Sequence, residues 1–271
     1  MKSRIPIIWI IIFLFGLVQP LPLDSKVLVA TTKDVVERYN KILDEQKTTL
    51  DGISHLKSKH AHRAVASMVI FLKALQVSES NIKTEFLIVP NNRRLKAVVE
   101  SGGAVAGLAD LWSATFDSNV YQSTAVIPSG NYFVGFYGLE ENKNLLHLKE
   151  HLNFEKLTAV SSKGWVVDWH TLQQLNLKEL HNVTDSETMR KVVKFRGFDF
   201  TLLAFPYNKD LSRKKFDITL VPAPGVKLAL DGSRHFMVSK THKDGKRVYK
   251  FLNLGLGILR EKNRFENFMR M

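Results

Sequence analysis

The chain has 271 residues, of which 45% are hydrophobic and 24% are charged, which is an ordinary globular composition with room for two modest domains. It contains no cysteine, which excludes thiol catalysis and thiolate metal sites but is compatible with export. The formal net charge is +13, which indicates either an anionic ligand or surface, or only a solvated basic surface. Nucleic acid fits poorly as a partner, since no basic run with interleaved aromatic residues occurs.

The N-terminal segment has the pattern of a secretory signal peptide. Lys2 and Arg4 precede an apolar run at 5–18, and a helix-breaking Gln-Pro-Leu-Pro follows at 19–22. The apolar run is short for a spanning helix. We expect residues 1–24 to direct export to the periplasm. No A-x-A cleavage pattern occurs, so an uncleaved N-terminal anchor is the alternative.

Apolar runs and helical spacing alternate along the first part of the chain. They predict a strand at 26–32, helices at 34–46 and about 60–75, a strand at 82–90, a helix from 92 that stops at two glycines, and a strand at 104–109. This order is typical of one wound α/β unit.

A second α/β unit follows. The expected elements are a strand at 131–138, a short helix at 145–152, a strand at 156–162, a helix at 165–175, a strand at 178–183, a helix at 185–195 and a strand at 199–205. Further strands and a helix at 245–263 come after it. We expect them to return to the first unit, which gives lobe 1 at 25–130 plus 226–271, lobe 2 at 131–225, and a hinge and cleft between the lobes. The chain is expected to cross near 128–132 and again near 222–226.

Several stretches together resemble the type II periplasmic solute-binding proteins, near the amino-acid binders. The stretches are "NNRRLKAVVESGGAVAGLADLW", "KLTAVSSKGWVVDWHTLQQL", "TMRKVVKFRGFDFTLLAF" and "LDGSRHFMVSKTHKDGKRVYKFLNLGLGILREKN". The resemblance covers nearly the whole chain after the leader, and it implies a two-lobed α/β fold.

The resemblance also implies an amino-acid clamp, and this sequence departs from it. The position of the usual first-lobe Asp holds Val105, and no Lys or Arg occurs from 97 to 142. Counting from Asp199, the position of the acid that binds the ligand's ammonium holds Ala204. Because a zwitterion buried without partners costs several kcal/mol, a free amino acid held in the usual way is disfavoured.

Candidate ligand contacts follow the predicted strand ends. Ser161, Ser162, Lys163 and Trp165 form a polar turn before a helix, where hydroxyls, a cation and helix N–H groups suit an anion. The alternative is a capped helix with a packed Trp. The other candidates, which equally suit caps, surface or packing, are Thr31, Thr32, Asn91, Arg93, Arg94, Asp110 and Trp112. Arg234 and His235, near the hinge, favour a structural role.

Neither a metal site nor a catalytic set is expected. The stretch His147–His151 matches H-x-x-E-H, but the predicted helix is short and lacks a third ligand. An enzyme would need a cleft carboxylate or His with a shifted pKa, and Asp110 is the strongest candidate.

The sequence therefore predicts an exported solute-binding protein, without cofactor, that closes over a small polar or anionic molecule for transport or sensing. Its partner would be a membrane transporter or a sensor. The alternative is an accessory or sensor protein of the same fold with a drifted pocket and no tight ligand.

Overall fold

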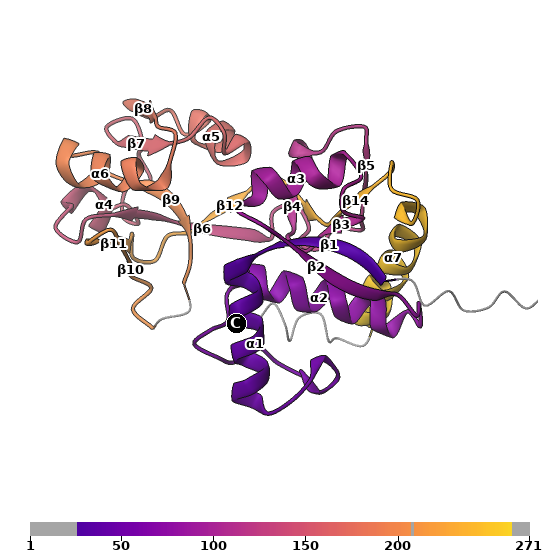
Figure 1. Ribbon diagram of the computed structural model, residues 1–271. Coiled ribbons are helices and arrows are strands. Elements are labelled where there is room, and N and C mark those ends of the chain that lie inside the picture. The colour runs from indigo at the N-terminus through magenta and orange to yellow at the C-terminus, as the bar shows by residue number, and fades with distance from the viewer. Residues whose placement is uncertain (1–25, 207–208, 262–271) are drawn as a thin grey trace, which may run out of the picture.

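The computed structural model describes residues 26–206 and 209–261, and its elements form two lobes (Figure 1). The signal peptide predicted at 1–24 lies outside the described residues. Within the described part of the chain, every helix is too short or too polar to cross a membrane.

The first lobe contains a five-stranded sheet in the order β2-β1-β3-β14-β5, in which β1 is parallel to β2 and β3, and β14 is antiparallel to β3 and β5. The strands are β1 (Lys26–Thr32), β2 (Lys83–Val89), β3 (Ala106–Gly107), β5 (Val120–Gln122) and β14 (Met237–Ser239). The helices are α1 (Lys33–Gln46), α2 (Arg63–Val77), α3 (Asn92–Glu100) and α7 (Gly245–Glu261). Apolar residues of α1, α2 and α7 form one core with the sheet, while α3 packs into a smaller one.

The second lobe is organised around β6 (Tyr132–Gly138), whose neighbours β9 (Thr201–Ala204), β11 (Ile218–Pro222) and β12 (Leu228–Leu230) are all antiparallel to it. β10 (Arg213–Lys215) extends this sheet, and β7 (Thr158–Ser161) pairs in parallel with β8 (Glu179–Asn182). The helices are α4 (Lys143–Leu146), α5 (Val166–Gln173) and α6 (Ser186–Arg196). The α/β class that the sequence predicts is confirmed.

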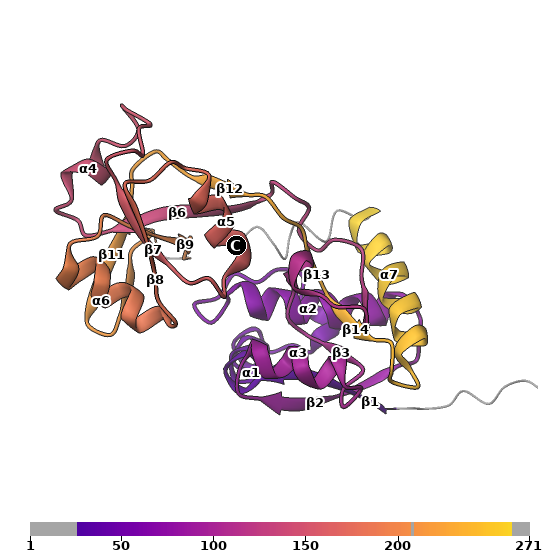
Figure 2. The ribbon, with the colours of Figure 1, turned by 90° about the horizontal axis from the view of Figure 1, so that it is seen from above.

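The return crossing lies later than the sequence analysis places it. β12 pairs with β6, with Leu228 opposite Val134 and Leu230 opposite Tyr132 (Figure 2). Because Leu230 is buried in the second core, residues 228–230 extend the second sheet instead of joining lobe 1. The chain enters the first lobe only at β13 (Arg234–His235), which pairs with β4 (Leu111–Trp112).

The helix expected at 145–152 is shorter than predicted. α4 ends at Leu146, and the chain continues as turns. His147 and His151 therefore do not share a helix face, and the ring of His147 contacts the carboxylate of Glu150 at 3.1 Å. The H-x-x-E-H match has no helical metal-site geometry.

The α2–α7 contact depends on a glycine. A Cβ at Gly255 would lie 1.8 Å from the carbonyl oxygen of Ala74 in α2, whereas a Cβ at Gly257 would meet no atom within 4 Å. Gly255 is therefore required for the close approach of the two helices, and Gly257 in the same helix is not.

We predict that Gly255→Ala lowers the free energy of unfolding by about 2–4 kcal/mol, because the added methyl group forces α7 away from α2. Gly257→Ala is the matched control and should raise it by up to about 1 kcal/mol, since alanine favours helix. Urea unfolding of both variants gives the difference. Equal effects of the two substitutions would contradict the close packing.

Candidate functional site

Side chains from both lobes line a cavity of about 1020 Å³, which we call the cleft. The first lobe contributes Arg63, Asn92, Arg93, Lys96, Leu111, Trp112, Ala114, Thr115, Phe116 and Arg234. The strand that enters the second lobe and the second lobe itself contribute Tyr132, Val134, Gly164, Trp165, Val166, Asp168, Leu202, Leu203, Ala204 and Arg213. The cleft therefore combines aromatic rings with several cations.

A buried carboxylate, Asp110, holds two of these arginines. Nη1 of Arg63 lies 2.8 Å from both carboxylate oxygens, and Nε of Arg234 donates to the same carboxylate. The hydroxyl of Ser67 also donates to it. Burial alone would raise the pKa of Asp110, but the charges of Arg63 and Arg234 outweigh burial and hold this pKa below its usual value. Asp110 is an ionised anchor.

Aromatic rings enclose the same arginines. The guanidinium carbon of Arg234 lies 4.4 Å from the ring centre of Trp112 and 5.2 Å from that of Tyr132. That of Arg63 lies 5.5 Å from the Tyr132 ring. Trp112 and Tyr132 meet edge to face at 5.1 Å. These contacts fix the orientation of both cations, since each ring presents its negative face to a guanidinium.

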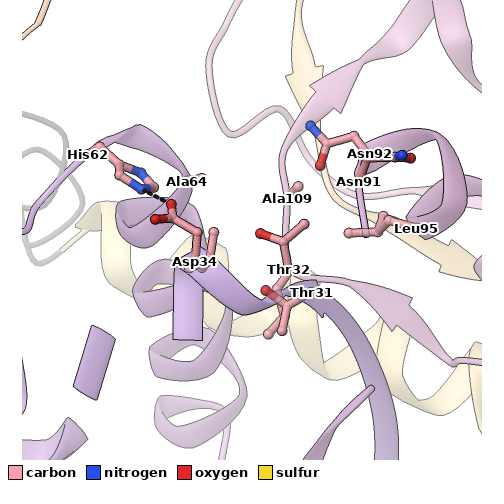
Figure 3. Close-up of a pocket in the computed structure, with 11 residues that line it drawn as sticks. Thr31, Thr32, Asp34, His62, Ala64, Asn91, Asn92, Leu95 and Ala109 are labelled. Carbon is pink, nitrogen blue, oxygen red and sulfur yellow. Dashed lines mark hydrogen bonds and ion pairs between the residues drawn. The ribbon is translucent and has the colours of Figure 1, made fainter. Parts of the chain in front are cut away.

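A smaller pocket of about 290 Å³ adjoins the cleft and shares Asn92 with it. Thr31, Thr32 and Asn91 line it, at the carboxyl ends of β1 and β2 (Figure 3). On its other side, His62 lies 3.1 Å from the carboxylate of Asp34. Polar side chains thus meet at the strand ends, which is where ligands bind in wound α/β sheets.

Asp168, in the first turn of α5, is the carboxylate on the cleft wall. Burial raises its pKa to about 6, and the charge of Arg234 opposes that shift. The side chain of Asp168 therefore changes from neutral to negatively charged as the pH rises through about 6.

The turn at 161–165 divides between interior and cleft. Ser161 and Ser162 are buried, and the hydroxyl of Ser162 accepts from the N–H of Gly164. The side chain of Lys163 is outside the cleft lining, with its ammonium 5.6 Å from the Trp169 ring centre. Trp165 lines the cleft and is 36% exposed. Of this turn, Trp165 and the backbone of Gly164 reach the cavity.

The other predicted residues separate in the same way. Arg93 and Trp112 line the cleft, whereas Arg94 is exposed elsewhere and its N–H is capped by Asn91 at 3.0 Å. Asp110 was expected to contact a ligand, but it is 1% exposed, is paired with two arginines and is not among the cleft-lining residues.

Sequence reasoning missed several cleft residues, namely Arg63, Lys96, Tyr132, Asp168 and Arg213, and it assigned Arg234 a structural role only. One signal was available. Asp168 is three residues after Trp165, so the two side chains lie on one side of the α5 start. Arg63 and Arg234 lie 47 and 124 residues from Asp110, and no local pattern connects them.

The described residues contain no group of three or more His, Asp or Glu side chains that could hold a metal ion. The shifted carboxyl in the cleft is Asp168, while Asp110, the expected candidate for catalysis, is buried behind two arginines.

We predict that Asp168→Asn stabilises the protein at pH 8 but not at pH 4. The folded state raises the pKa of Asp168 from 3.8 to about 6, so it binds this proton more tightly than the unfolded chain does. The contribution of the bound proton to the free energy of unfolding is fully present below about pH 4. It is lost as the pH rises through about 6. The gain in unfolding free energy at pH 8 should be about 1–2 kcal/mol after allowing for partial exposure.

Urea unfolding at the two pH values measures this gain. Glu141→Gln, at an exposed loop position, is the control and should change little at either pH. An Asp168→Asn effect that is the same at pH 4 and pH 8 would contradict the raised pKa of the Asp168 carboxyl.

No protein-family model matches the sequence, and no curated protein matches it. Solved structures do match, at low identity. The periplasmic VFT2 domain of BvgS from Bordetella pertussis is 14% identical, with a TM-score of 0.58 over 90% of this chain and 92% of that one. The probable amino-acid ABC transporter extracellular-binding protein ytmK from Bacillus subtilis is 11% identical. Its TM-score is 0.57, and the match covers 90% of this chain and 95% of that one.

A third similar structure is the amino acid ABC transporter substrate-binding protein AbpA from Streptococcus pneumoniae, bound to L-arginine. It is 12% identical, with a TM-score of 0.52 over 90% of this chain and 93% of that one. At such identities the likeness establishes the fold alone. The chain has the two-lobed fold of the type II periplasmic solute-binding proteins, as its sequence predicts.

Proposed function

We propose that the chain is a solute-binding protein whose cleft closes over a small anionic ligand with an apolar or aromatic body. One observation carries the proposal: cations outnumber carboxylates on the cleft wall. The cations are Arg63, Arg93, Lys96, Arg213 and Arg234, and the carboxylate is Asp168. An anion is the ligand charge that this wall would stabilise.

Two of the five cations remain for the ligand after internal pairing. Arg63 and Arg234 share Asp110, and Lys96 lies 3.0 Å from a carboxylate oxygen of Glu100. Arg93 is exposed at the start of α3. Arg213 donates its Nε to the carbonyl of Ala204 at 2.7 Å and also interacts with the hydroxyl of Tyr137, but it has no carboxylate partner among the described residues.

Arg93 and Arg213 belong to opposite lobes, so an anion between them would stabilise the closed arrangement. We place the hinge at 128–132 and 231–233, where the chain passes between the two sheets. Of the described residues, 26–130 and 234–261 then belong to the first lobe, and 131–206 and 209–230 to the second.

The apolar part of the ligand follows from the rings. Trp112, Phe116, Tyr132 and Trp165 line the cleft together with Leu111, Val134 and Leu202. A partly exposed Trp165 facing this wall gains by burial under a flat apolar group, since an aromatic side chain contributes a large apolar area.

The vacated clamp positions support a ligand other than a free amino acid. Val105 is fully buried in the first core, and Ala204 lines the cleft without any acceptor on its side chain. At neutral pH an ammonium would find only Asp168 among the cleft-lining side chains that the structure describes, against the surrounding cations.

We further propose that the protein acts outside the cytoplasm with a membrane transporter or a sensor as partner. The basic start and short apolar run of the sequence support export. The similar solved structures are a periplasmic domain, an extracellular-binding protein and an ABC transporter substrate-binding protein, which supports the same setting.

A second candidate function is an accessory or sensor protein of this fold that needs no tight ligand. The observation that favours it is the pairing of Arg63 and Arg234 with Asp110, because the carboxylate offsets one of these two positive charges from within the protein. Native mass spectrometry of freshly purified protein distinguishes the two. A co-purifying small anion supports the first, and its absence together with failure of a carboxylate screen supports the second.

We predict that Arg93→Gln weakens binding of the anion found by mass spectrometry or by the screen. The expected loss of affinity is about ten- to a hundredfold, because one charge-assisted hydrogen bond is lost. Arg94→Gln is the matched control, since Arg94 is adjacent in α3 but outside the cleft lining, and it should bind within about twofold of the parent. Calorimetry with the co-purified molecule, or with aromatic carboxylates from a screen, measures both. A larger loss in Arg94→Gln would move the site off the cleft.

Trp165→Ala should lower the affinity for the same ligand by a similar factor, because stacking on the ring is lost. Lys163→Ala tests the remaining part of the predicted polar turn. If Lys163→Ala weakens binding as much as Trp165→Ala does, the result would indicate that the Lys163 side chain turns toward the ligand in the closed state.

We predict that residues 1–30, fused to a reporter that is active only outside the cytoplasm, give reporter activity. The physical reason is the basic start followed by an apolar run of signal-peptide length. Changing Lys2 and Arg4 to Glu should reduce that activity. A silent reporter with the fusion in the cytoplasm would contradict export.

A further inference from the structure

A second basic cavity is lined by residues of both lobes and shares Arg213 with the cleft. Its volume is about 700 Å³. The loop between α1 and α2 contributes Lys59, α6 contributes Arg190, and β10 contributes Arg213, Lys214 and Lys215. In Figure 1, β10 lies at the lower side of the left lobe, toward this loop. We call the cavity the basic pocket.

Arg190 is the unusual member of the basic pocket. It is 5% exposed, and its Nη1 donates to the carbonyl oxygen of Arg213 at 3.1 Å. Burial, and then the charge of Arg213, lower its pKa. Among the described residues no carboxylate forms an ion pair with Arg190. A buried guanidinium compensated by one carbonyl is costly, and an anion would offset that cost.

Around the basic pocket, cationic side chains also outnumber carboxylates. Two carboxylates border the pocket through serines: Glu45 accepts from the hydroxyl of Ser58 at 2.5 Å, and Asp210 accepts from that of Ser212 at 2.9 Å. Both serines line the pocket, and neither carboxylate does. Five cationic side chains therefore line one cavity, and no acid lines it among the residues that the structure describes.

We propose that the basic pocket binds a multivalent oxyanion of the phosphate or sulfate class, with Arg190 as its buried anchor. Four further cations can contact its oxygens. The charge-assisted bonds to a doubly charged tetrahedral ion would be short and strong, and an arginine fork matches its geometry.

The site bridges the lobes. Lys59 comes from the first lobe, whereas Arg190, Lys214 and Lys215 come from the second. Without an anion these like charges repel one another across the gap, and with one they are attracted to a shared centre. The bound oxyanion would thus favour the approach of the lobes, and it would be coupled to the cleft ligand through Arg213, which lines both cavities.

Calorimetric titration with sodium phosphate tests the proposal, with sodium chloride of matched ionic strength as the reference. Lys59→Gln should raise the phosphate Kd by about three- to tenfold, and Lys214→Gln should do so as well. Lys57→Gln, two residues away in the same loop and outside the pocket lining, is the control and should stay within about twofold. Arg190→Gln, if it folds, should raise the Kd by tenfold or more.

Three outcomes would overturn the site. The first is phosphate binding no stronger than that of chloride in the parent protein. The second is an equal effect of Lys57→Gln and Lys59→Gln, which would indicate a diffuse surface potential. The third is loss of phosphate binding in Arg93→Gln with Lys59→Gln unchanged, which would place the anion in the cleft. Because Lys59 and Lys214 are exposed, their variants give an answer even if Arg190→Gln does not fold.

Discussion

The buried ion pair of Asp110 with Arg63 and Arg234 is the interaction on which the cleft depends. Removing one partner of such a group leaves an uncompensated charge in the interior, at a cost of about 3–5 kcal/mol. The group joins the start of α2, the segment after β3, and β13, which are remote from one another in the sequence. It therefore fixes three separate chain segments at one point below the cleft.

That point is also where the chain passes between the lobes. Tyr132, the first residue of β6, packs on Trp112 and receives both guanidinium groups on its ring. β12 runs beside β6 and is followed, after three residues, by Arg234. A Cβ on Gly232 would contact Trp112 of the first lobe and Val167 of the second, so space there is small. The passage between the lobes therefore lies beside a buried, charged group.

The local order of strands and helices was predictable from the sequence, because periodicity and caps are local signals. The cap of α6 by Asp185 is an example, since its carboxylate accepts from the N–H groups of Glu187 and Thr188. Three features were not local. The apolar run at 226–230 specifies a strand but not which sheet it joins, and the partner of Asp110 is set by the fold. The direction of Lys163 likewise depends on packing against Trp169, which the turn sequence does not encode.

The charges on the cleft wall come from several elements and give one consistent account of the cleft. Val105 is buried in the first core and the side chain of Ala204 offers no acceptor, while the arginines of the cleft wall come from α2, α3, β10 and β13. Arg63 and Arg234 share the single negative charge of Asp110, which leaves one net positive charge at that point, and Arg93 and Arg213 add to the positive potential, one on each lobe. Asp168 opposes that potential only when ionised, and its pKa of about 6 means that mild acidification removes the opposition. The cleft would therefore hold an anion more tightly as the pH falls, provided that the anion itself stays charged.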